Sequence, residues 1–137
     1  MKSRPNWYYT QSSVIPFKKE KNDIKVLLIT SRKKKKWIVP KGIVELDLSP
    51  QKSAEKEALE EAGIEGEVMS KKIGDYEHNK WGDICTVSVY PMEVKVEHSH
   101  WAEEKERKRK WFSLKDAVKK VSNKDLSQII EKLLKYI

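Results

Sequence analysis

Cysteine is almost absent from this sequence, and so is any long apolar segment. Cys85 is the single cysteine among 137 residues, which excludes an intramolecular disulfide and a zinc site built from several thiolates. No stretch approaches the roughly 20 apolar residues that span a bilayer, and residues 1–10 lack the continuous apolar run of a secretory signal. We therefore expect a cytoplasmic protein that has no membrane segment.

Internal repeats, linkers and low-complexity tails are also absent, apart from short basic runs. The hydrophobic share of 38% suffices for one core, so we expect a single domain over residues 1–137 with one active site. The formal net charge of +8 attracts polyanions such as nucleotides, inositol polyphosphates, RNA or an anionic membrane surface. Charge alone does not choose among these partners.

Short apolar runs alternate with polar turns along the chain, and this pattern predicts strands interleaved with helices. We expect a hairpin of two strands at its start and a loop over residues 40–42. The expected strands cover residues 7–17, 24–30, 37–39, 67–76, 84–96 and 108–112, with a bulge or an edge at Pro91. The expected helices cover residues 50–62, 113–121 and 123–137. This order is typical of an α/β sandwich.

The helix expected over residues 50–62 has clear signals at both ends. Ser49 can cap its exposed amides, Pro50 is tolerated at the first helical position, and Gly63 favours a stop. Small residues recur every four positions on one face, at Ala54, Ala58 and Ala62. That face can approach a sheet closely, which gives the glutamates of the helix defined positions.

Glu57, Glu60 and Glu61 are three and four residues apart, so they converge on one side of this helix. Like charges crowded in this way repel, and a hard divalent cation such as Mg²⁺ or Mn²⁺ would relieve the repulsion. The alternative is an ordinary solvated face with ion pairs such as Lys56 with Glu60. Taken alone, Glu-x-x-Glu-Glu usually means this second arrangement.

The context of the glutamates favours the metal site. Gly42 is followed by five residues, Leu48, seven further residues and then Lys-Glu-Ala-Leu-Glu-Glu-Ala-Gly-Ile over residues 56–64. This pattern resembles the Nudix box, with six of its nine defining positions matched and a seventh changed from arginine to lysine. Residues 37–42 resemble the strand before the box, and residues 107–118 resemble the late segment of diphosphoinositol polyphosphate phosphohydrolases.

The resemblance implies an α/β/α sandwich with a central mixed β-sheet. It assigns Glu57 and Glu61 to the metal, together with the backbone carbonyls of Lys41 and Gly42. It assigns Glu60 as general base, with a third metal ligand as the alternative. The cofactor implied is Mg²⁺, with Mn²⁺ as a substitute.

Two positions depart from the box, because Leu48 replaces its first glutamate and Lys56 its arginine. We expect Leu48 to pack against the loop and Lys56 to pair with an acidic neighbour. The candidates for that pairing are Glu45, Asp47 and Glu60. The expected consequence is altered bracing of loop and helix more than lost chemistry.

Substrate contacts are expected from basic and polar groups near the box. By resemblance to the polyphosphate hydrolases these are Thr30, Ser31, Arg32 and Arg107, with Lys124 as a looser candidate. Arginine offers bidentate contacts to phosphate, and the lysines at 33–36 add mobile charge. Gln11 and Thr10 stand where those relatives carry basic residues, which counts against inositol pyrophosphate specificity.

Three functions remain open from the sequence. The first is Mg²⁺-dependent hydrolysis of a phosphoanhydride bond in a diadenosine polyphosphate or diphosphoinositol polyphosphate. The second is hydrolysis of a nucleoside triphosphate or of an RNA 5′-pyrophosphate. The third is a non-catalytic module that binds nucleotides or nucleic acid, in which Trp81 and Trp101 would stack on the bases. The oligomeric state is not predicted.

Overall fold

The computed structural model describes residues 10–80 and 82–137, which form one mixed sheet between helices. Trp81 and residues 7–9 of the first expected strand lie outside this range. The strands are β1 (Thr10–Glu20), β2 (Asp23–Thr30), β3 (Trp37–Ile38), β4 (Lys41–Ile43), β5 (Ile64–Val68), β6 (Gly74–Lys80), β7 (Asp83–Glu97) and β8 (Arg109–Ser113). The helices are α1 (Pro50–Ala62), α2 (Leu114–Lys120), α3 (Lys124–Glu131) and the 3₁₀ turn η2 (Leu133–Lys135).

The sheet is organised around two long strands, β1 and β7, which pair in parallel. The other pairings are antiparallel: β2 and β4 pair with β1, β5 and β6 pair with β7, and β3 and β8 pair with β2. The expectation of a mixed sheet is therefore confirmed. None of the helices in the described ranges is long and apolar enough to cross a membrane.

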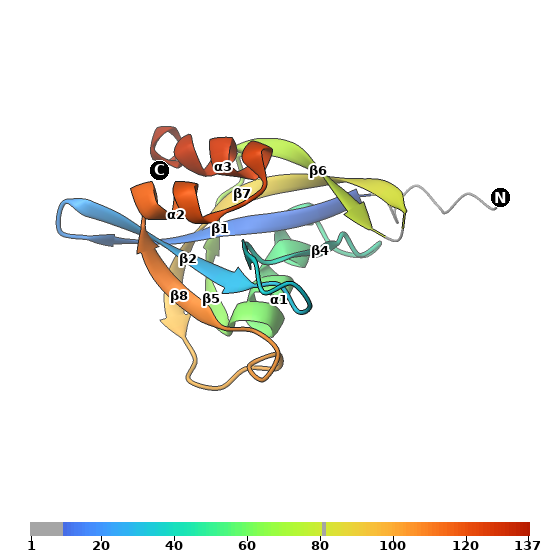
Figure 1. Cartoon of the computed structure of the whole chain (residues 1–137), viewed down its shortest axis with the longest axis horizontal. Helices are drawn as coiled ribbons and strands as arrows, with labels where there is room; N and C mark the ends of the chain where they lie inside the picture. The colour runs from blue at the N-terminus through green and yellow to red at the C-terminus, as the bar shows by residue number, and fades with distance from the viewer. Residues whose placement is uncertain (1–9, 81) are drawn as a thin grey trace.

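Alternating side chains along β2 divide the core into two layers. Val26 and Leu28 join the cluster that α2 and α3 cover, whereas Leu27 and Ile29 join the cluster that α1 covers. Figure 1 shows α2 and α3 on one face of the sheet and α1 on the other. The glutamates of α1 therefore lie on the face of the sheet that α1 covers, near β4.

The hairpin of β1 and β2 and the helix α1 form as the local signals predict. β1 and β2 make an antiparallel hairpin, with Phe17 opposite Val26. The Ser49 hydroxyl accepts a hydrogen bond from the Lys52 amide, and Gly63 ends α1 with φ of 68°. Left-handed backbone of this kind suits glycine because no Cβ clashes there. The helices after Ser113 and Asn123 also form, although the last gives way to η2 after Glu131.

Three expectations about the sheet were wrong. Residues 67–76 do not form one strand, because β5 and β6 pair with different parts of β7 and the chain turns between them. Pro91 lies at this change of partner, inside the sheet, and not at an edge. Residues 40–42 are not simply a loop, because β4 pairs with the part of β1 that β2 leaves open. These errors arise because pairing partners are decided by distant segments.

Candidate functional site

The direction in which the acidic side of α1 points is set by the burial of its small-residue face. Ala54, Ala58 and Ala62 are completely buried against the sheet, which fixes the rotation of the helix about its axis. Glu57, Glu60 and Glu61 therefore line one cleft beside β4. The cleft has a volume of about 350 Å³ and is lined by Lys41, Gly42, Ile43, Glu45, Ser53, Lys56, Glu57, Glu60 and Glu61. The predicted convergence of the three glutamates on one site is what the structure shows.

β4 packs its backbone directly onto the carboxylates. The Lys41 amide donates to Oε1 of Glu61 over 3.2 Å. A Cβ added to Gly42 would lie 2.0 Å from Oε2 of Glu57. Only glycine leaves room here for the glutamate side chain, so the first residue of the motif is required by close approach and not by backbone conformation.

The carboxylates resist ionisation in the free protein. Burial, then the charges of Glu61 and Glu60, raises the pKa of Glu57 to about 8. Burial also raises the pKa of Glu61 to about 7, outweighing the Arg107 cation, whose Nη2 lies 3.7 Å from Oε2 of Glu61. Ionisation of both carboxylates would crowd negative charge into a partly buried site, and a bound cation would relieve that repulsion.

A divalent cation fits this donor set, although the site is not a closed cage. In the described residues, no three His, Cys, Asp or Glu side chains are already arranged around a common point. The residues that would hold the ion are Glu57 and Glu61, with Glu60 and the carbonyls of Lys41 and Gly42 around the same cleft. Such an open oxygen site suits Mg²⁺, which keeps several waters and takes further ligands from substrate phosphates.

The segment from Glu97 to Lys108 supplies residues that sequence patterns did not indicate. Glu103 lines a second part of the site together with Glu57 and Glu61. Its amide donates to the Glu60 carbonyl over 3.1 Å, which attaches the loop to α1. Gln11 lines the same space, and its buried Nε2 has no hydrogen-bond partner in the described part of the protein. A polar loop offers no local signal for such a placement.

Trp101 and Arg109 hold this loop against the end of α1. The Trp101 indole donates to the Glu61 carbonyl over 3.0 Å, and the Arg109 guanidinium lies 3.9 Å from the centre of the indole ring. Arg109 also donates to the carbonyls of Ala62 and His98. One face of Trp101 is thus covered by Arg109, and the indole braces the loop against α1.

Lys56 pairs with Glu45, one of its three expected acidic partners. Its Nζ lies 3.0 Å from Oε1 of Glu45, and the same carboxylate raises the pKa of the lysine. Leu48 is half-buried, with its amide bonded to the Glu45 carbonyl over 3.1 Å. This lysine–glutamate pair connects the loop after β4 to α1, as an arginine–glutamate pair would.

The predicted substrate residues fall in different environments. Arg32 and Arg107 line the carboxylate site. Ser31 lines a neighbouring pocket, whereas Thr30 is 4% exposed and its hydroxyl accepts from the Lys108 amide over 2.9 Å. Lys124 is exposed at the start of α3, next to residues that line that pocket. The structure therefore brings Arg32 and Arg107 together and gives Thr30 a structural contact.

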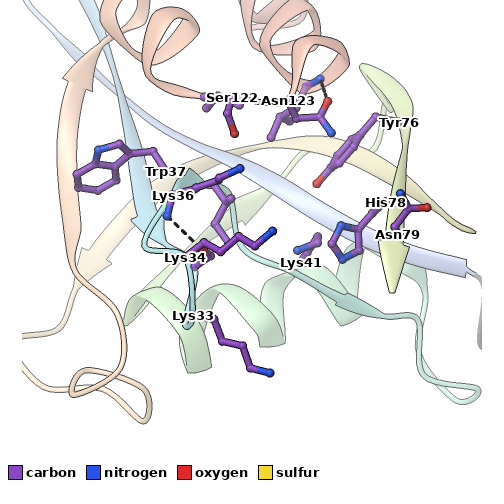
Figure 2. A pocket seen from close by; sticks show the side chains of 14 residues that line it. Lys33, Lys34, Lys36, Trp37, Lys41, Tyr76, His78, Asn79, Ser122 and Asn123 are labelled. Carbon is purple, nitrogen blue, oxygen red and sulfur yellow. Dashed lines mark hydrogen bonds between the residues drawn. The ribbon is translucent and has the colours of Figure 1, made fainter. Parts of the chain in front are cut away.

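The neighbouring pocket has a basic rim and an apolar floor. Its volume is about 510 Å³, and in the described residues no acidic side chain lines it. Figure 2 shows lysines from the 31–38 segment and Lys41 on one side, with side chains of β6 opposite. The rim carries Lys33, Lys34, Lys36, Lys41, His78, Asn79, Ser122 and Asn123, and the floor Trp37, Ile38, Tyr76, Val121 and Leu126.

This pocket adjoins the carboxylate site. Lys41 and His78 line both spaces, and burial, followed by the charge of Glu61, raises the pKa of Tyr76. Sequence reasoning missed His78 and Tyr76, because nothing in the spacing of β6 distinguishes them from ordinary strand residues. An extended ligand can therefore place one end in the basic pocket and its anionic part beside the glutamates.

Comparison with known proteins gives a consistent assignment. The NUDIX domain family matches residues 10–133. Nudix hydrolase 21, chloroplastic, of Arabidopsis thaliana is 32% identical over 123 residues, which are 85% of this chain and 62% of that protein. Diphosphoinositol polyphosphate phosphohydrolase 3-beta of Bos taurus is 32% identical over 117 residues, which are 84% of this chain and 70% of that protein. The chain thus spans under two thirds of the plant relative's length.

Solved structures share the fold at lower identity. A C. elegans Ap4A hydrolase matches with a TM-score of 0.78 and 20% identity, over 93% of this chain and 97% of the other. The NUDIX domain of Shewanella oneidensis NrtR, complexed with ADP ribose, matches with a TM-score of 0.72 and 15% identity, over 93% and 86%. At these identities the likeness concerns the arrangement of sheet and helices.

Proposed function

Since this chain belongs to the Nudix hydrolase family, we propose that it hydrolyses a phosphoanhydride bond in a diadenosine polyphosphate, with Mg²⁺ as cofactor and Mn²⁺ as a substitute. The observation that carries this proposal is that a carboxylate cleft adjoins a basic pocket with an apolar floor, with Lys41 in the lining of both. The cleft suits the metal and the reacting phosphates. The floor suits a nucleobase, which has little affinity for a wholly polar surface.

In the proposed reaction, water attacks phosphorus and the bridging P–O bond breaks. Glu60 accepts the proton of the attacking water, and the leaving phosphate departs with the electrons of the broken bond. Arg32, Arg107 and Lys41 neutralise the phosphate oxygens as charge shifts onto the leaving group. Bound Mg²⁺ supplies charge neutralisation and makes water more acidic. No covalent nucleophile is needed, and Cys85 is fully buried in β7.

A diphosphoinositol polyphosphate is the second candidate. The lysine-rich rim and the name of the bovine relative favour it. An inositol ring that carries phosphates on most carbons would, however, leave the apolar floor without a matching ligand surface. Gln11 at the carboxylate site is uncharged, so it adds no charge attraction for such a dense anion.

The test is release of phosphate and nucleotide from a panel of substrates, with and without Mg²⁺. The panel contains diadenosine polyphosphates, inositol pyrophosphates, nucleoside triphosphates and triphosphorylated RNA. We expect metal-dependent turnover of diadenosine polyphosphates that falls about 10²-fold or more in Glu60→Gln, because a general base contributes on that scale. Faster turnover of another class in the panel would show that this class, and not diadenosine polyphosphates, is the substrate. Salt-dependent binding without turnover of any class would favour a binding module.

Gly42→Ala tests the metal site separately. The added methyl would meet the flexible end of Glu57, which can swing away, so thermal stability should change little. The displaced carboxylate should weaken Mg²⁺ binding about tenfold or more, on the scale seen when groups around a metal are disturbed. Calorimetric titration with Mg²⁺ and a melting curve measure the two effects. Unchanged metal affinity would contradict the assignment of Glu57 as a ligand.

A further inference from the structure

Glu103 occupies the two arginines that face the carboxylate site. Its Oε1 lies 2.7 Å from Nε of Arg107 and 3.0 Å from Nη2 of Arg32. Arg32 is also held from its other side, because its Nε lies 3.0 Å from Oε2 of Glu106. Both arginines that line this part of the site are thus already engaged by carboxylates of the segment from Glu97 to Lys108.

The position of Glu103 is set by the backbone and not by its side chain alone. Its amide bonds to the Glu60 carbonyl, and its own carbonyl accepts from the amides of Glu106 and Arg107. The carboxylate is 17% exposed, and the Arg107 side chain is 9% exposed, so this pair is shielded from water. Arg32 is different, because 57% of its side chain is exposed and it can exchange partners readily.

We propose that Glu103 is an internal phosphate mimic, which occupies Arg32 and Arg107 in the ligand-free protein and is displaced by a ligand that carries several adjacent phosphates. Carboxylate and phosphate oxygens accept hydrogen bonds from the same guanidinium N–H groups, so they compete for these donors. A polyphosphate brings more charge than one carboxylate, and it can therefore displace Glu103. A product with fewer phosphates competes less well, so the return of Glu103 favours its release. Glu103 is then a specificity-determining residue of the site.

This inference rests on the proposed function in one respect, namely that Arg32 and Arg107 receive substrate phosphates. It is tested by the metal-free binding of inorganic tripolyphosphate, measured by calorimetry on the native chain, on Glu103→Gln and on Glu104→Gln. Glu104 is the matched control because it lies in the same segment and loses the same charge, but pairs with His100. Thermal melting of each variant shows that it is folded.

We expect Glu103→Gln to bind tripolyphosphate about tenfold more tightly than the native chain, which corresponds to about 1.4 kcal/mol. Glu104→Gln should bind less than about twofold more tightly, since a carboxylate that pairs with His100 and with neither arginine acts on the ligand only through screened long-range repulsion. Equal tightening in both variants, or weaker binding by Glu103→Gln, would overturn the proposal. A damaged fold would weaken binding, so tightening is not explained by structural loss.

A second measurement uses the native chain and does not depend on the variant's folding. The Nε–H signal of Arg107 in a ¹⁵N-resolved NMR spectrum reports its hydrogen bond to Glu103. Addition of tripolyphosphate should shift this signal, and equimolar orthophosphate should shift it less. An unmoved signal at saturating tripolyphosphate would refute displacement. If these results hold but the substrate panel shows no hydrolysis, the displacement stands and the proposed function fails.

Discussion

Replacement of Glu61 by glutamine is expected to lower kcat by about a thousandfold, which equals about 4 kcal/mol of lost transition-state stabilisation. Glu61 is 8% exposed, lines both parts of the carboxylate site, and accepts a hydrogen bond from the Lys41 amide. Glutamine has the same shape but lacks the charge that would hold a cation. The substitution thus removes metal binding without removing volume.

Steady-state kinetics at several Mg²⁺ concentrations measure this effect. Glu55→Gln is the matched control, because Glu55 lies on the same helix but pairs with Lys52 at 3.5 Å and does not line the cleft. The control should retain native kcat within about twofold, as expected for an exposed pair. Retention of substantial Mg²⁺-dependent turnover by Glu61→Gln would show that the metal is held elsewhere.

The second large effect is a loss of metal-free stability as pH rises. Glu57 and Glu61 have folded-state pKa values of about 8 and about 7, both raised above the ordinary value of 4.5. Below pH 4.5 both states of the protein hold the protons, so these groups do not affect stability. Between pH 4.5 and 8 the unfolded chain loses its protons first, so stability falls as pH rises through this window.

We expect the Tm of the protein in chelator to fall by on the order of 5 °C or more from pH 5.5 to pH 8.5 on account of these groups. Millimolar Mg²⁺ at pH 8.5 should restore much of the loss, because a ligand of the folded state stabilises it. Glu57→Gln and Glu61→Gln should each have a flatter pH profile, and each should melt higher than the native chain at pH 8.5 without metal. If the Tm of the native chain instead rose from pH 5.5 to pH 8.5, in parallel with that of both variants, Glu57 and Glu61 would not destabilise the metal-free protein on ionisation.

Local signals predicted the parts of the site that lie on one helix. Ser49, Pro50 and Gly63 mark the ends of α1, and the alanine stripe indicates which face is buried. The direction of the glutamates follows from that face alone. The same reasoning predicted the β1–β2 hairpin, whose pairing is between neighbours in sequence.

Local signals failed where a distant segment supplies the partner. β4 exists because its backbone completes the edge of β1, and β5 separates from β6 because each pairs with its own part of β7. The family resemblance assigns Thr30 to the substrate, and local signals did not indicate that its hydroxyl also accepts a hydrogen bond from the amide of the distant Lys108. Local sequence patterns do not indicate these contacts, because the partners lie far apart in the chain.

The sequence by itself determined the family, the helix that carries Glu57, Glu60 and Glu61, and the direction in which they point, because capping and helical periodicity act over a few residues. Only the tertiary structure decided that Glu103 joins these carboxylates, and that a basic pocket from three separate segments opens beside them. Those placements depend on contacts between residues far apart in the chain. Such contacts form when the sheet closes and its two faces are covered.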